Sequence, residues 1–120
     1  MSGKLALGNV FHTTTALILL VAVWNTQAAS QYVRRNNHPG VIVFVHGIFG
    51  DATHTWTHAE TKTYWPTLLT RDPVFDAMDI YVYEYPTPTT GSTYSLNELA
   101  DHMRLILSQH GVFNHQTVIF

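Results

Sequence analysis

The sequence of 120 residues contains no cysteine and few charged side chains. Without cysteine the chain has no disulfide framework, no thiolate zinc site and no cysteine nucleophile. Lys, Arg, Asp and Glu make up 12% of the residues, about half of the share usual in soluble proteins. The formal net charge is −2, so we expect no nucleic-acid partner. What is present is a 46% hydrophobic share, typical of one small globular domain, and eight histidines.

The first 28 residues have the charged, apolar and small-residue order of a secretory signal peptide. Lys4 precedes an uncharged apolar run at residues 16–24, and polar and small residues follow this run. The run is shorter than the roughly 20 residues that a membrane-spanning helix needs. We therefore expect cleavage near Ala28 or Ala29 and a secreted product, with an uncleaved membrane anchor as the alternative. Membrane association is expected only through this segment.

Three apolar runs in residues 29–120 predict β-strands. The run at residues 41–45 is an unbroken series of β-branched and aromatic residues, which indicates a strand covered on both faces, as in parallel sheets. Residues 78–85 alternate tyrosines with Ile, Val and Glu, which predicts a second strand with one end half exposed. Residues 116–120 begin a third apolar run.

Helix signals fill both gaps between these strands. Residues 65–71 predict a short helix with a proline in its first turn. Residues 95–110 carry apolar side chains at helical spacing, Ser95 and Glu98 match a capping box, and Gly111 is placed to end the helix. The order strand, helix, strand, helix, strand predicts an α/β fold with a partial parallel sheet.

Such a sheet is incomplete. Three strands with two crossover helices leave apolar faces and sheet edges open. We therefore expect residues 29–120 to be the N-terminal part of a larger domain, preceded by the signal or anchor segment at residues 1–28.

The segment after the first strand, residues 45–51 (VHGIFGD), is the strongest candidate for chemistry. Ligands of open α/β sheets bind outside the carboxyl ends of the strands. Gly47 and Gly50 permit backbone angles and close approach that other residues do not. The N–H groups of Ile48 and Phe49 can then face a developing oxyanion, where one donor is worth about 10²–10³ in rate. The alternative is a tight turn that needs glycine only for steric reasons.

The runs VIVFVHGIFGDATHTW, WPTLL, DIYVYEYPTP, SLNELADHM and TVIF together resemble the N-terminal half of an α/β-hydrolase. The similarity is to the serine lipase and esterase-like branch, whose first central strand ends in His-Gly. This resemblance implies an acyl ester or lipid substrate and no cofactor. It implies an oxyanion loop in which the N–H of Ile48 is favoured, with Phe49 beside it and shaping roles for His46 and Gly47. It also implies that the last strand leads into the nucleophile elbow.

The family's elbow has the pattern G-x-S-x-G, and no pair of glycines in this sequence brackets a serine in that way. The nearest stretch, GSTYS at residues 91–95, lacks the second glycine. We therefore expect the nucleophile and its triad partners beyond Phe120, and a chain that is inactive alone. Aromatic candidates for the substrate wall are Tyr64, Trp65 and Tyr94. The alternatives are a non-catalytic secreted binding module and a truncated relic.

We expect no metal site. His54 and His58 have the i, i+4 spacing of helical zinc ligands, but no glutamate lies between them as in H-E-x-x-H, and the surrounding threonines disfavour a helix. A solvated loop is the favoured interpretation. Asp79 is interpreted as an ordinary polar residue at the start of a strand.

Overall fold

The computed structural model describes residues 29–85, 87 and 94–120. The expected signal or anchor segment at residues 1–28 lies outside the described residues, and so does most of the loop at 86–94. Within the described ranges, no helix is both long enough and apolar enough to cross a membrane.

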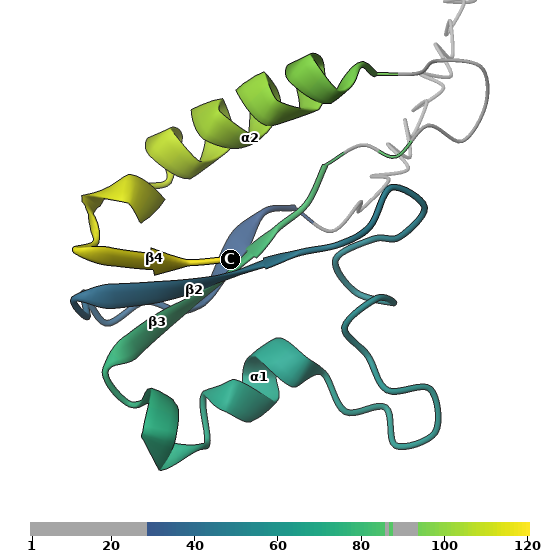
Figure 1. Ribbon diagram of the computed structural model, residues 1–120. Helices are drawn as coiled ribbons and strands as arrows, with labels where there is room; N and C mark the ends of the chain where they lie inside the picture. Colours follow the sequence, from purple (N-terminus) through teal and green to yellow (C-terminus); the bar gives the residue numbers. More distant parts are fainter. Residues whose placement is uncertain (1–28, 86, 88–93) are drawn as a thin grey trace, which may run out of the picture.

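A four-stranded mixed sheet forms the centre of the fold, with the strand order β1-β3-β2-β4 (Figure 1). Strands β2 (Gly40–Val45), β3 (Met78–Tyr83) and β4 (Thr117–Ile119) run parallel, as the sequence predicts. Strand β2 pairs on both of its edges, so it lies inside the sheet.

Strand β1 (Gln31–Arg34) corrects the expectation of a wholly parallel sheet. It pairs antiparallel with the outer edge of β3, where Tyr32 lies opposite Tyr81. With four residues, two of them polar, β1 is too short to produce a periodic pattern in the sequence. The fold is therefore α/β in the broad sense, with a mixed sheet.

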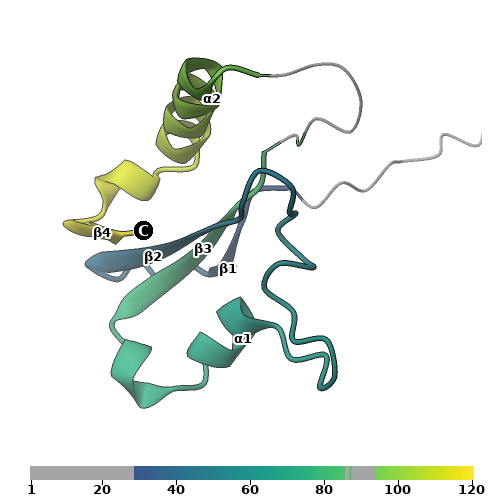
Figure 2. The same cartoon turned by 45° about the vertical axis from the view of Figure 1, so that its right-hand side comes forward.

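Helices α1 (Trp65–Leu69) and α2 (Leu96–Gln109) lie on opposite faces of this sheet (Figures 1 and 2). Because β3 and β4 lie on either side of β2, two right-handed crossovers turn in opposite directions and place their helices on different faces. The predicted capping box begins α2: Ser95 Oγ accepts the N–H of Glu98, and the Glu98 carboxylate accepts the N–H of Ser95. Gly111 follows the helix with a left-handed φ of 74°.

The buried core lies between the sheet and α2. Its side chains are Val41, Val43, Tyr81, Tyr83, Tyr85, Leu107 and Val112. Of the run predicted as a strand with one end half exposed, only Met78 and Glu84 are partly exposed, and the tyrosine rings are buried. The Tyr81 hydroxyl lies 2.7 Å from His110 Nδ1, and the Tyr83 hydroxyl lies 2.7 Å from His102 Nδ1. Burial raises the pKa of both tyrosines to about 12.

Arg34 holds the connection between α1 and β3, which includes the short 3-10 helix η1 (Pro73–Phe75). Its guanidinium donates to the carbonyls of Thr70, Phe75 and Met78. One side chain of β1 therefore binds the end of α1, the end of η1 and the start of β3.

Asp79 is completely buried, so it is not the ordinary polar residue that the sequence indicated. Its carboxylate accepts the N–H of Asn36, lies 2.9 Å from His38 Nδ1 and lies 3.1 Å from Nε2 of His115, which follows the 3-10 helix η2 (Val112–Asn114). Burial by itself raises the pKa of Asp79. The hydrogen bonds from Asn36 and His115, with the charges of the two histidines, lower this pKa overall.

Replacing Leu107 by alanine is expected to lower the free energy of unfolding by about 2–5 kcal/mol, because the lost methyl groups leave a cavity in the core. Leu105→Ala on the exposed side of α2 is the matched control, with an expected change of about 0.5 kcal/mol or less. Urea unfolding followed by circular dichroism measures both values. Equal effects would contradict the observed packing of α2.

Asp79→Asn is expected to lower the free energy of unfolding at pH 7 by about 1–3 kcal/mol, because it removes the buried charge that the histidines and Asn36 bind. Folding lowers the pKa of Asp79 from an unfolded value of about 3.9. Its contribution is therefore present above about pH 4 and is lost as the pH falls below that value. Unfolding measured at pH 7 and pH 3 should give a difference between wild type and variant that shrinks at pH 3. Asp76→Asn, at an exposed position, should be neutral at both.

Candidate functional site

The candidate site begins where β2 ends, at the carboxyl end of the parallel strands. The N–H of Gly50 donates to the carbonyl of Gly47 over 2.9 Å, which closes a turn with Ile48 and Phe49 at its tip. Phe49 is 95% exposed and Ile48 is half exposed. Neither N–H group at the tip donates a hydrogen bond to another described residue. The 46–50 turn thus has two backbone donors available to a ligand.

The two glycines of this turn have different roles. A Cβ atom at Gly50 would collide with the Thr55 hydroxyl and contact the Gly47 carbonyl oxygen at 3.4 Å. A Cβ atom at Gly47 would have nothing within 4 Å. Among the described glycines only Gly111 has a positive φ. Neither Gly47 nor Gly50 is therefore required for a left-handed backbone conformation. Close packing accounts for Gly50, while open space lies beside Gly47.

His46 lies buried at the start of the turn. It is 3% exposed, and its ring stacks on Tyr85 with the centroids 4.2 Å apart and the planes 8° apart. Its Nδ1 lies 2.9 Å from the carbonyl oxygen of Gly47, and its own carbonyl accepts the Tyr85 hydroxyl at 3.1 Å. His46 therefore holds the start of the turn and is not free to act on a substrate.

Glu84 is the residue that sequence analysis missed. It directly follows β3, and one carboxylate oxygen lies 3.1 Å from His46 Nε2. The other oxygen accepts the N–H of Ala52 at 2.5 Å. The signal in the sequence is a carboxylate on the same face as the buried apolar Ile80 and Val82, where an unpaired charge is costly.

The aromatic candidates lie in different surroundings. The Tyr64 hydroxyl donates to the carbonyl of Ala52 at 3.1 Å, and burial, followed by the charge of Glu84, raises the pKa of Tyr64. Trp65 begins α1 and is about half exposed. Tyr94 lines a separate hollow of about 240 Å³ with Glu98, Leu99 and His102. The structure thus places the Tyr64 side chain against Ala52, six residues after His46.

The histidine pair in the following segment forms local contacts. Asp51 accepts the backbone N–H and faces Nδ1 of His54, and these bonds, led by the backbone one, lower the pKa of Asp51. His58 Nδ1 lies 3.2 Å from the Thr61 hydroxyl. In the part of the chain that the structure describes, no group of three His, Cys, Asp or Glu residues could hold a metal ion.

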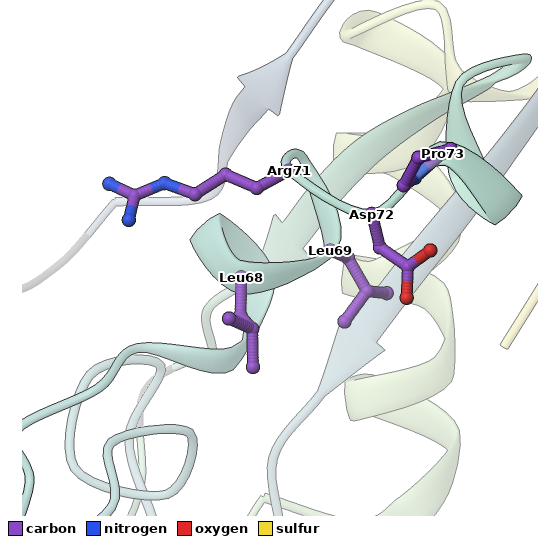
Figure 3. A pocket seen from close by; sticks show the side chains of 5 residues that line it. All are labelled: Leu68, Leu69, Arg71, Asp72 and Pro73. Atoms are coloured by element: carbon purple, nitrogen blue, oxygen red, sulfur yellow. The ribbon is translucent and has the colours of Figure 1, made fainter.

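A hollow of about 520 Å³ lies at the end of α1 (Figure 3). It is lined by Leu68, Leu69, Arg71, Asp72 and Pro73, and the Arg71 side chain extends away from the others. These residues lead into the amino end of β3, whereas the 46–50 turn follows the carboxyl end of β2. The hollow is therefore not part of the candidate site.

Comparisons of the chain with protein-family models, curated proteins and solved structures found no match.

Tyr85→Phe is expected to lower the free energy of unfolding by about 0.5–2 kcal/mol, because the buried carbonyl of His46 loses its donor. The stacked ring remains in the variant, so the loss reports the hydroxyl alone. Tyr94→Phe removes a hydroxyl at an exposed position and serves as the control. Thermal or urea unfolding of the two variants tests the contact, and a Tyr85→Phe protein as stable as its control would argue against it.

Proposed function

We propose that the chain forms the N-terminal part of a serine ester hydrolase domain, in which the 46–50 turn binds the oxyanion of an acyl substrate. One observation carries this proposal: the unbonded N–H groups of Ile48 and Phe49 lie on an open turn at the carboxyl end of a central parallel strand. Backbone N–H groups held in this way stabilise the negative oxygen of a tetrahedral intermediate.

The position of the turn in the sheet supports the proposal. Strand β2 is flanked by β3 and β4, and successive crossovers leave the sheet on opposite faces. Ligands of open α/β sheets bind in the crevice outside the carboxyl ends of strands where the strand order reverses. The 46–50 turn follows the carboxyl end of β2, the strand at which this order reverses.

The pairing of β4 also supports it. Val118 lies opposite Val41, and Ile119 lies opposite Ile42. In this register Phe120 falls opposite Val43, so a strand that continues past Phe120 runs beside residues 44–45 toward His46. Under the proposal this is where the family's nucleophile elbow begins, so the serine lies next to the oxyanion donors.

The chemistry follows from that arrangement. The serine oxygen attacks the acyl carbonyl, its proton passes to a histidine, and the carbonyl oxygen becomes negative. The N–H groups of Ile48 and Phe49 stabilise that charge. The ester's alcohol leaves with the proton, and water then releases the acyl group by the same steps. Exposed aromatic rings at Phe49 and Trp65 favour an apolar acyl chain.

A second candidate function is a non-catalytic binding module. It is favoured by the nearly complete exposure of Phe49 at the tip of the turn, since a lone exposed aromatic ring suits a partner surface. Export through the N-terminal segment is proposed for either function. The experiment below separates the two.

The first experiment is to purify the native product from its source cells, determine its intact mass and treat it with a fluorophosphonate probe, which reacts with activated serines. We expect a product without residues 1–28 that extends past Phe120, hydrolyses p-nitrophenyl esters and carries the probe on a serine in a G-x-S-x-G turn. The 120-residue chain should show no turnover above its Ser92→Ala and Ser95→Ala control. A stable native product that ends at Phe120 and takes no probe would contradict the hydrolase proposal and favour the binding module.

In the active product, Gly47→Ala should lower kcat by about tenfold or more, because its methyl group enters the open space beside the oxyanion donors. Its free energy of unfolding should change by about 0.5 kcal/mol or less, because that space is empty of protein atoms.

A further inference from the structure

We infer that Glu84 is the positioning residue of the 46–52 loop, the segment from His46 to Ala52 that carries the proposed oxyanion donors. The inference rests on the proposed function and adds a residue that the resemblance does not supply. Glu84 itself does not touch the substrate; it acts through the shape of the loop.

The Glu84 carboxylate binds both ends of this loop. Its Oε2 accepts the N–H of Ala52, where the loop ends, and its Oε1 lies 3.1 Å from His46 Nε2, where the loop begins. A carboxylate only accepts hydrogen bonds, and the Ala52 N–H is its donor; His46 Nε2, beside the other oxygen, also accepts the N–H of Tyr85 at 3.4 Å. Hydrogen bonds to a charged acceptor are roughly twice as strong as neutral ones, and low exposure strengthens them further.

Glu84 is itself fixed to the sheet. It follows the last residue of β3, and Ser30 Oγ both accepts its N–H at 2.8 Å and donates to its carbonyl at 3.0 Å. The Glu84 side chain is 11% exposed and the His46 side chain is fully buried. The carboxylate is therefore in place before a substrate binds.

The tip of the loop depends on these ends. Ile48 and Phe49 are exposed and have little packing of their own, so their N–H directions follow the positions of His46 and Ala52. The Tyr64 hydroxyl holds the carbonyl of Ala52 independently, so loss of Glu84 is expected to loosen the loop and leave the fold intact. A misplacement of a catalytic group by about 1 Å costs about 10² in rate.

The experiment uses the full native product with Glu84→Ala, Glu84→Gln and the matched control Glu60→Gln, an exposed carboxyl in the segment that follows the loop. Amide hydrogen exchange across residues 46–52, kcat and KM for an ester, and fluorophosphonate labelling are measured for each. In Glu84→Ala we expect exchange in the loop to rise about tenfold or more, with core strands β2 and β3 unchanged. We expect kcat to fall about 10²-fold, with KM changed less than about threefold.

Glu84→Gln keeps one acceptor oxygen, so its kcat should lie between those of wild type and Glu84→Ala, and it serves if Glu84→Ala does not fold. Unchanged loop exchange in both variants would overturn the inference. Loosened exchange with wild-type kcat would also overturn it, because the contact would then be structural only. A wild-type product with no labelling and no turnover would instead refute the proposed function, and loop exchange would still report whether Glu84 holds the loop.

Discussion

The structure depends on the burial of strand β3 from Asp79 to Tyr83. From Asp79 to Tyr83 no residue is more than 2% exposed, so each polar atom of the strand must find a partner inside the protein. The tyrosine hydroxyls find theirs at His102 on α2 and at His110, which caps its C-terminal end. Asp79 and Glu84 lie at the two ends of the buried stretch. Each carboxylate contacts histidine and accepts a backbone N–H, and the two sets of contacts lie at opposite ends of the sheet. The strand therefore determines where the connections at both of its ends must lie.

Local signals in the sequence predict the elements that form through local interactions. The capping box at Ser95 and the glycine at position 111 predict the ends of α2 closely, because both act within one helical turn. The unbroken apolar run predicts β2 because neither face of this strand is exposed to solvent along its length. Strand β1 is different. Its four residues are stabilised by pairing with β3 and by Arg34 bonds to distant carbonyls, and neither appears in a local pattern.

The candidate site shows the same division. The position of the 46–50 turn follows from the strand before it and from its glycines. Glu84 could not be assigned from local pattern, because its role depends on how two strands pair. Val45 and Tyr83 are the last residues of β2 and β3 and lie opposite each other. The residues that follow them, His46 and Glu84, are therefore neighbours. The alternation of the strand places Glu84 on the face of Ile80 and Val82, and strand pairing identifies His46 as its partner.

The two tyrosine–histidine bonds have a consequence for how α2 packs. Apolar contacts are non-directional, so a helix with a row of leucines and isoleucines can slide along a sheet at little cost. The bonds from Tyr81 to His110 and from Tyr83 to His102 are directional, and the later tyrosine binds the earlier histidine. A displacement of α2 by one turn, about 5.4 Å, separates both pairs and leaves two buried hydroxyls unbonded. A single axial position of the helix is thereby selected from several that the apolar surface alone would tolerate.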